Sequence, residues 1–296
     1  MARLKALARK FAETGLPILL VGATGTGKEL FAQCIHEWSG CRGPFVDVNC
    51  GALPKEMVES LLFGHRRGAF TGAVDGVDGL VTASDGGTLF LDEFSSLPPE
   101  AQVKLLRVLE TGEVRRVGEA VKRSVRFRVI AAVQDDLDQR LERGDLRLDL
   151  YQRVAGLVLG LPPLRARSED LWALALHFAA SAGFQLQPEC RLVIEGYHWP
   201  ANARELKFVV ERAGRLSKGA SVGAPQVAEA IELGLPPGQV AVQRAARGLR
   251  HDLEALLARH GGDVRAAAGE LGVSRSTLYE RLHTCGVRLR LPRASR

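Results

Sequence analysis

The segment Gly22-Ala23-Thr24-Gly25-Thr26-Gly27-Lys28-Glu29 has the pattern GxxxxGK, and it decides the fold. It follows a short apolar run, Leu16 to Val21, and precedes an amphipathic run, Leu30 to His36. A short apolar run that ends at a glycine is typical of a strand buried on both faces of a parallel sheet. Strand, glycine loop and helix in this order predict a phosphate-binding loop, and therefore an α/β nucleotide-binding core in which helices flank a parallel sheet.

The residue types of this loop suit the binding of nucleotide phosphates. Glycines allow backbone N–H groups to converge on phosphate oxygens at the N-terminus of a helix, and Lys28 adds a positive charge beside the terminal phosphates. Glu29 stands where many such loops have Ser or Thr as a magnesium ligand. A magnesium ion is therefore expected to rely on Asp92 and water.

A second apolar run, Thr88 to Leu91, ends on the acidic pair Asp92-Glu93. Such a pair can simply cap the structure that follows, because Ser95-Ser96-Leu97-Pro98-Pro99 comes next. Together with a phosphate loop, the pair is better interpreted as catalytic. Asp92 is then the magnesium ligand, and Glu93 is the base that polarises the attacking water.

Further polar residues are candidates for the same site. Gln134 ends a predicted buried strand and is expected near the terminal phosphate. Arg147 and Arg153 would ordinarily belong to a solvated helix face, but in a site built between subunits one of them can reach a neighbour's phosphates as an arginine finger. Arg204 either senses nucleotide or forms a surface salt bridge, in a helix for which Asn202 is the expected cap.

Between the two nucleotide motifs lies a hexapeptide that belongs to neither, Gly68-Ala69-Phe70-Thr71-Gly72-Ala73. Alone it would be a glycine turn, but between these motifs it is expected to report the nucleotide state to a partner through its aromatic and hydroxyl side chains. The glycine-rich segment that follows, residues 75–87, predicts a mobile return.

The positive charge of the chain is concentrated at its C-terminal end. The net charge is +6, and residues 244–296 alone, with 11 Arg, no Lys and 5 acids, account for all of it. Asp263 and Ser274 are placed to cap two short helices joined by a Gly272 turn, which predicts a helix-turn-helix that binds double-stranded DNA. A three-helix interaction module is the alternative. The residues expected to contact DNA are Arg275, Ser276, Thr277, Tyr279 and Arg281.

The length of 296 residues indicates two or three domains. The expected segments are an ATPase core (1–160), a small helical lid (161–233), a linker (234–248) and an all-α DNA-binding domain (249–296). Five cysteines without metal spacing are expected to be buried, reduced side chains. No signal peptide and no apolar run of membrane-spanning length is found, so a cytoplasmic protein without a membrane partner is expected.

Eight motifs, taken in order along the chain, resemble those of sigma-54-dependent transcriptional activators, the NtrC-like branch of the AAA+ ATPases. They are GATGTGKE, VNCGALP, LLFGHRRGAFTGA, DGGTLFLDE, LLRVLETGEVRRVG, RLDLYQRV, LPPLR and WPANARELK. The C-terminal segment resembles their Fis-type helix-turn-helix. The resemblance implies a hexameric, magnesium-dependent ATPase that binds enhancer-like DNA sites. It also implies that GAFTGA engages sigma-54 in the RNA polymerase holoenzyme and that ATP hydrolysis remodels the closed promoter complex.

The resemblance also assigns individual roles. Asn49 matches the residue that couples to the catalytic Glu93, and Gln134 matches the first sensor. The trans-acting arginines are matched by Arg147 and Arg153. By the same carry-over, Arg204 corresponds to the second sensor.

Two departures from the family pattern bear on function. The sensor strand ends Ala131-Ala132-Val133-Gln134, where the family usually has Ala-Ala-Thr followed by Asn or His. This departure supports an alternative hypothesis, a DNA-binding regulator with a degenerate ATPase that only senses nucleotide.

No receiver or ligand-sensing domain precedes the ATPase, so the chain is either a stand-alone activator or the C-terminal part of a longer protein. A replication-type loader is a third hypothesis, but such proteins should lack GAFTGA.

Overall fold

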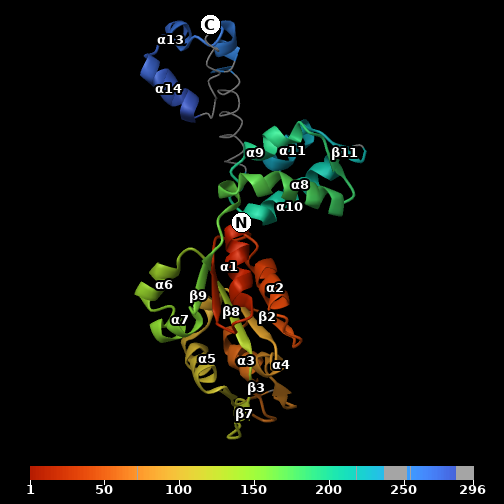
Figure 1. Ribbon diagram of the computed structural model, residues 1–296, viewed down its shortest axis with the longest axis vertical. Helices are drawn as coiled ribbons and strands as arrows, with labels where there is room; N and C mark the ends of the chain where they lie inside the picture. Colours follow the sequence, from red (N-terminus) through yellow and green to blue (C-terminus); the bar gives the residue numbers. More distant parts are fainter. Residues whose placement is uncertain (72, 218, 237–251, 254, 285–296) are drawn as a thin grey trace. The chain divides into compact units, whose positions relative to one another are not determined.

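The computed structural model describes residues 1–71, 73–217, 219–236, 252–253 and 255–284, and it divides into two compact units, residues 1–224 and 225–296 (Figure 1). The first unit contains a five-stranded parallel sheet in the order β2-β5-β8-β1-β9. Its strands are β1 (Ile18–Val21), β2 (Phe45–Asn49), β5 (Thr88–Asp92), β8 (Arg128–Val133) and β9 (Leu157–Gly160). The predicted α/β class with a parallel sheet is confirmed.

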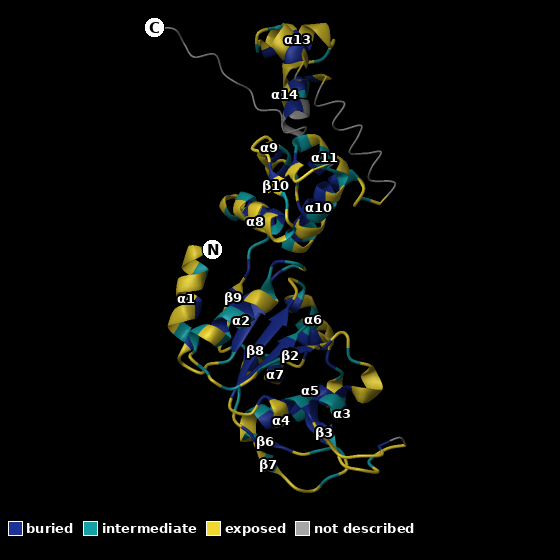
Figure 2. Ribbon diagram, turned by 90° about the vertical axis from the view of Figure 1, so that its right-hand side faces the viewer, coloured by how far each residue is buried: buried dark blue, intermediate teal, exposed yellow. Residues whose placement is uncertain are grey.

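Alternate residues of the central strands face two different layers of helices. On β1, Leu19 belongs to one apolar cluster, whereas Ile18 and Leu20 belong to another. The Leu19 cluster includes residues of α3 (Val58–Phe63), α4 (Leu80–Ala83), α5 (Pro99–Thr111), α6 (Leu137–Arg143) and α7 (Leu148–Val154). The other cluster includes residues of α1 (Ala2–Ala12) and α2 (Lys28–Trp38). Every residue of β8 is buried (Figure 2), as expected for a strand covered on both faces.

A group of short elements follows the sheet within residues 161–233, for which a helical lid was predicted, and we refer to it as the lid. It comprises the 3-10 turn η3 (Leu164–Ala166), α8 (Ser168–Ser181), β10 (Gln185–Leu186), α9 (Cys190–Glu195), α10 (Asn202–Leu216) and β11 (Ser221–Val222). The Trp199 side chain is buried, and its Nε1 donates to the Ile194 carbonyl oxygen at 2.8 Å. This contact fixes the turn that leads from α9 into α10.

The prediction that Asn202 caps α10 is wrong. The N-cap position is held by Ala201 without a side-chain hydrogen bond, and Asn202 is the first helical residue, with φ of +56°. Its side chain is directed away from the helix, since Oδ1 accepts from the Leu164 amide at 2.7 Å. Asn tolerates this left-handed conformation better than most residues do.

The prediction of a mobile return over residues 75–87 is also wrong, because this segment is structured. It contains β4 (Val77–Asp78), which pairs antiparallel with β3 (Gly64–His65), and the short helix α4 with the buried Val81. A Cβ on Gly79 would lie 2.3 Å from the Gly64 nitrogen. The glycines here permit close packing of backbones, which composition alone does not distinguish from mobility.

The second unit begins inside α11 (Ala224–Glu232), at its second residue, and also contains a helical cluster near the C-terminus. The described helices of that cluster are α13 (Val264–Glu270) and α14 (Arg275–Thr284), and their buried apolar residues pack with Leu253, Leu256 and Leu257. Most of the predicted linker, from residue 237 on, lies outside the described residues. In the part of the chain that is described, no helix has the length and apolarity required to cross a membrane.

The expectation for the cysteines is confirmed for two of them. Cys50 and Cys190 are buried, whereas Cys34 and Cys41 are partly exposed, and all four are free thiols. Burial raises the pKa of the Cys50 thiol, and the nearby Asp92 carboxylate raises it further. Cys285 lies outside the described residues.

Candidate nucleotide-binding site

The phosphate loop lies between the end of β1 and the start of α2, as predicted. Gly25 and Gly27 have φ of +75° and +93°, values that favour glycine. The Lys28 ammonium donates to the carbonyl oxygen of Gly22 at 2.7 Å and to that of Ala23 at 3.3 Å. The loop therefore curls around the lysine that begins the helix.

Burial of the Lys28 ammonium lowers its pKa, and the nearby Arg204 charge lowers it further. The carboxylates of Asp92, Asp135 and Glu93 act in the opposite direction. A partly desolvated cation attracts an added anion more strongly than it would in water, whereas the three carboxylates repel an anion and attract a divalent cation. The electrostatics therefore suit a phosphate chain that is bound together with a divalent cation.

The acidic pair occupies the carboxyl end of β5. Asp92 Oδ1 accepts from the Glu93 amide at 3.0 Å, and Glu93 has φ of +51°, in the left-handed region. Glu93 precedes a 3-10 turn, η2 (Phe94–Ser96), but its side chain makes no capping hydrogen bond. The capping interpretation therefore does not hold for Glu93, and both acids line the cavity beside the phosphate loop.

Asn49 ends β2, the strand next to β5, and its side chain is fixed by the backbone. Its Oδ1 accepts from the amides of Gly51 and Ala52 at 3.0 and 3.1 Å. The Glu93 carboxylate lies close to Gly51, because a Cβ built on that glycine would be 2.0 Å from Glu93 Oε2. Asn49 and Glu93 thus approach the same short turn, although no direct hydrogen bond joins them in the structure; their predicted coupling stays a prediction.

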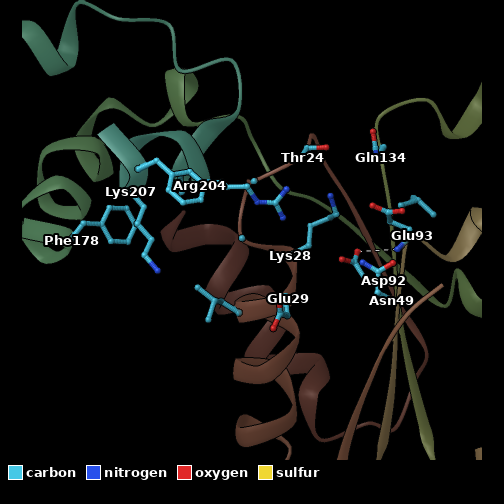
Figure 3. Close-up of a pocket in the computed structure, with 16 residues that line it drawn as sticks. Thr24, Lys28, Glu29, Asn49, Asp92, Glu93, Gln134, Phe178, Arg204 and Lys207 are labelled. Atoms are coloured by element: carbon cyan, nitrogen blue, oxygen red, sulfur yellow. Dashed lines mark hydrogen bonds between the residues drawn. The ribbon is translucent and has the colours of Figure 1, made fainter. Parts of the chain in front are cut away.

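A cavity of about 500 Å³ joins these groups. In Figure 3, Lys28, Asp92, Asn49 and Gln134 come from the sheet side, whereas Phe178, Arg204 and Lys207 come from lid helices α8 and α10. The predicted residues that line it are Thr24, Gly25, Gly27, Lys28, Glu29, Asn49, Asp92, Glu93, Gln134 and Arg204. Gly22, Ala23 and Thr26 belong to the loop but do not line the cavity.

The apolar side chains that line this cavity were not predicted from the sequence. Leu30, Phe178 and Phe208 line it together with Lys207, and Leu30 and Phe208 are 67% and 56% exposed. Large apolar side chains this exposed indicate a ligand surface when they gather at one cavity. One signal was present in the sequence, because Phe208 follows Arg204 by four residues and therefore shares its face of the helix.

The carboxylates of the cavity suit a magnesium ion that is bound mainly through the phosphates of a nucleotide. Asp92 and Glu29 line the cavity, but the described residues contain no group of three or more His, Cys, Asp or Glu arranged to hold a metal. Magnesium commonly uses one or two carboxylates and completes its shell with phosphate oxygens and water. The site thus fits magnesium brought with a nucleotide better than a resident metal.

The two candidate arginine fingers do not line this cavity. Arg147 forms an ion pair with Asp149 at 2.6 Å, and this hydrogen-bonded pairing raises the pKa of Arg147 and lowers that of Asp149. The Arg153 guanidinium donates to the Leu109 carbonyl oxygen at 2.7 and 3.2 Å. Both are exposed residues of the α7 region, so a role at a neighbour's site stays a prediction.

The GAFTGA hexapeptide forms the tip of the β3–β4 hairpin. The Gly68 amide donates to the Ala73 carbonyl oxygen at 2.8 Å, which closes the turn; Gly72 is outside the described residues. The Phe70 ring is 43% exposed and lies 5.0 Å from the His65 ring, and Thr71 is exposed. Ala69, by contrast, faces a second hairpin, since a Cβ on Gly118 would lie 3.1 Å from the Ala69 Cβ.

That second hairpin supports the first one. Its strands are β6 (Glu113–Val114) and β7 (Arg123–Ser124), which pair antiparallel. Arg116 and Arg123 both pair with Asp78 on β4, the latter at 3.0 Å. The β3–β4 and β6–β7 hairpins therefore contact each other within one compact unit.

In the second unit, both predicted caps are confirmed. Asp263 accepts from the Arg265 and Ala266 amides at the start of α13, and Ser274 Oγ accepts from the Thr277 amide at 3.1 Å at the start of α14. Of the predicted DNA contacts, Arg275, Ser276 and Tyr279 are exposed and Thr277 is partly exposed. The Arg281 side chain lies outside the described residues.

Comparison with known families gives three matches along the chain. A model of the Sigma-54 interaction domain matches residues 1–159. A model of the AAA+ ATPase lid domain matches residues 165–240, and one of the bacterial regulatory protein Fis family matches residues 250–283.

Among curated proteins, the chain is 40% identical over 295 residues to the C4-dicarboxylate transport transcriptional regulatory protein DctD of Rhizobium meliloti, a match that covers 97% of the chain and 63% of that protein. It is 38% identical over 290 residues to the transcriptional regulatory protein GlrR of Escherichia coli, with coverage of 95% and 65%. The chain thus spans somewhat less than two thirds of the length of these relatives.

Among solved structures, NtrX from Brucella abortus in complex with ATP has a TM-score of 0.69 and 31% identity, covering 97% of this chain and 68% of that chain. A mutant of RuvB from Thermotoga maritima has a TM-score of 0.57 at 18% identity, covering 98% and 88%, and shares the fold alone.

Proposed function

The chain belongs to the Sigma-54 interaction family of AAA+ proteins, and on that basis we propose that it is an ATP-dependent activator of sigma-54 transcription. In this proposal the chain hydrolyses ATP, binds enhancer-like DNA sites through its Fis-type segment and remodels the closed complex of sigma-54 RNA polymerase through the GAFTGA loop. Nucleotide binding, hydrolysis, assembly and contact with sigma-54 are each supported by a different group of residues.

Nucleotide binding is supported by the mixed lining of the cavity. Phosphates would lie beside Lys28 and the loop amides, and the base would contact the apolar side chains of Leu30, Phe178 and Phe208. Arg204 extends from α10 toward Lys28 (Figure 3), where a guanidinium can contact the terminal phosphates. This arrangement also gives the lid a direct contact with the bound nucleotide.

Hydrolysis is supported by the acids at the ends of the parallel strands. Magnesium, when bound with ATP, would neutralise phosphate charge and polarise the terminal phosphoryl group. Asp92 and Glu29 are the carboxylates available to hold it, directly or through water. Glu93 is the base that accepts a proton from the attacking water, and Asn49 lies beside the turn against which the Glu93 carboxylate packs.

Assembly into a ring, expected to be a hexamer, would supply the remaining charges. Arg147 and Arg153 are exposed and do not line their own cavity, so a contact with nucleotide would be made with a neighbour's. An arginine supplied across an interface stabilises charge on the transferred phosphoryl group. The Arg147–Asp149 and Arg153–Leu109 contacts would have to exchange for phosphate contacts when subunits meet.

The observation that carries the activator proposal is the exposed Phe70-Thr71 tip on the same compact unit as the nucleotide cavity. An aromatic side chain that is 43% exposed at the end of a hairpin leaves apolar surface in water unless a partner covers it. The tip has no charged side chain, and none of its described residues lines the nucleotide cavity. Its chemistry is therefore separable from hydrolysis.

The degenerate-ATPase hypothesis has less support. Val133 is buried at the end of β8, but the next residue, Gln134, is exposed and lines the cavity. Its amide group has the two N–H donors that a phosphate-sensing residue needs. The departure from the family pattern therefore leaves a donor at the sensor position.

The variant Thr71→Ala tests the activator proposal, with Thr71→Ser as the matched control that keeps the hydroxyl. We expect Thr71→Ala to hydrolyse ATP and bind DNA like the wild type, to lose its complex with sigma-54 formed with a transition-state nucleotide analogue, and to open no promoter. Thr71→Ser should retain activity. Normal activation by Thr71→Ala, or loss of its ATPase activity, would contradict a role of this loop in contacting sigma-54.

Phosphate release separates the activator from the degenerate ATPase. Wild-type protein, at concentrations that allow assembly, should release phosphate well above the background of Glu93→Ala. Equal rates for the two proteins would favour the hypothesis of a regulator that binds nucleotide without hydrolysing it.

A further inference from the structure

Three consecutive carbonyl groups of the phosphate loop are held by donors from the lid. Asn202 Nδ2 donates to the Thr24 oxygen at 2.9 Å, and the Ala203 amide donates to the Gly25 oxygen at 3.0 Å. Arg167 Nη2 donates to the Thr26 oxygen at 2.8 Å. We refer to the two side chains, Asn202 and Arg167, as the lid clamp.

Holding these carbonyls sets the direction of the loop's amides. In a trans peptide the C=O and the following N–H point in opposite directions. The three held carbonyls belong to the peptide units that carry the amides of Gly25, Thr26 and Gly27. The amides of Gly25 and Gly27 have no acceptor within the described part of the chain, while that of Thr26 bonds only at 3.4 Å, to Ala23. These amides are the donors that a phosphate-binding loop uses.

Burial and hydrogen bonds hold both clamp residues in place. Asn202 is 2% exposed, adopts a left-handed conformation and also accepts from the Leu164 amide, so its side chain has a single orientation. Burial lowers the pKa of Arg167, and its Nε is buried without a partner among the described residues. Burial of a guanidinium costs folding free energy unless its other N–H groups form hydrogen bonds, and the bond from Nη2 to the Thr26 oxygen is one of these.

The backbone around the clamp leaves little room for movement. A Cβ on Gly25 would lie 2.2 Å from the Ala201 carbonyl oxygen, so the lid turn rests directly on this glycine. A change in the position of the lid must therefore change the loop, and a change in the loop must be transmitted to the lid. By thermodynamic linkage, a ligand that prefers the clamped loop also stabilises the clamped lid.

We propose that Asn202 and Arg167 are positioning residues, which hold the phosphate loop with its amides free for phosphate and couple the position of the lid to nucleotide occupancy. The proposal rests on the proposed nucleotide binding, but it concerns residues that contact the loop from outside the cavity, since neither clamp side chain lines it. It also predicts that the nucleotide-free loop is already ordered by the lid.

Four variants of the full chain test the clamp. Arg167→Met and Asn202→Asp each remove one donor, the latter keeping an acceptor for the Leu164 amide. Arg167→Lys keeps the charge, and Arg165→Met is the matched control, because Arg165 is an exposed arginine two residues away. With a fluorescent ATP analogue and Mg²⁺, we expect Arg167→Met and Asn202→Asp to raise Kd about tenfold, the scale of one lost charged or buried hydrogen bond. Arg167→Lys should have a smaller effect, and Arg165→Met should change Kd by less than about twofold, as expected for a surface substitution.

Amide hydrogen exchange of the nucleotide-free proteins tests, independently of ATP binding, whether the clamp orders the phosphate loop. The peptide that covers residues 22–28 should exchange faster in Arg167→Met and Asn202→Asp than in Arg165→Met and the wild type. If the wild type binds no nucleotide, the proposed function fails, while the exchange rates still show whether the lid orders the loop. Equal exchange and equal Kd in Arg167→Met and Arg165→Met would overturn the clamp.

Discussion

The left-handed backbone of Glu93 gives a quantitative test of how the base is held. Its φ of +51° allows its amide to donate to Asp92 Oδ1 at 3.0 Å. An L-residue in this conformation costs roughly 1–2 kcal/mol, whereas glycine adopts it without strain but loses about 0.5–1 kcal/mol more entropy on folding. The pair Glu93→Ala and Glu93→Gly removes the same carboxylate, so the two differ mainly in backbone freedom. We expect Glu93→Gly to be the more stable of the two by about 0.5–1 kcal/mol.

Thermal unfolding of the nucleotide-free proteins measures this difference. For a unit of this size, 1 kcal/mol corresponds to about 2–4 °C in Tm, so the transition of the ATPase unit should lie about 1–4 °C higher in Glu93→Gly than in Glu93→Ala. Both variants should bind ATP and release no phosphate above background. If Glu93→Ala were as stable as Glu93→Gly, the backbone at this position would carry no strain. If either variant hydrolysed ATP at the wild-type rate, Glu93 would not be the base.

Three further predictions concern nucleotide binding, assembly and DNA. Lys28→Ala should abolish binding of a fluorescent ATP analogue, because the phosphates lose their point charge; unchanged affinity would contradict its role. Mixing an Arg147→Ala, Arg153→Ala double variant with Glu93→Ala should partly restore phosphate release, since some interfaces then combine an intact base with intact arginines, and no rescue would count against trans-acting arginines. A chain ending at residue 238 should keep ATPase activity and lose the salt-sensitive binding to DNA, which gel-shift titrations at several salt concentrations would detect.

The site residues that lie at the ends of the sheet strands could be predicted, because the sequence shows where each apolar strand ends. Asn49, Asp92 and Gln134 each end or follow an apolar run, and the carboxyl ends of parallel strands meet at one edge of a sheet. The phosphate loop was predicted for the same reason, as the first crossover from strand to helix. Here local pattern and global fold agree, so few alternatives remain.

The lid contributions could not be predicted in the same way. Phe208 shares a helix face with Arg204, but the sequence does not place Phe178 or Leu30 at the same site, and only the folded chain brings the three to one cavity. Asn202 stands at the start of a helix, and the local rule for caps gave the wrong role because its Oδ1, the atom that would accept at a cap, accepts from the distant Leu164 amide instead. Roles that depend on contacts between residues far apart in the chain have no short-range signature.

Backbone strain in this chain coincides with the proposed nucleotide site. Among the described residues, the non-glycine positions with positive φ are Glu93, Trp199 and Asn202. Glu93 is the proposed base, Asn202 belongs to the lid clamp, and the buried Trp199 anchors the turn that presents Asn202 to the loop. Such conformations persist only where surrounding contacts hold them. Asn202, which adopts this strained conformation, is also a residue whose side chain joins the lid to the phosphate loop, so a loss of the strain there would relax the geometry on which nucleotide binding is proposed to depend.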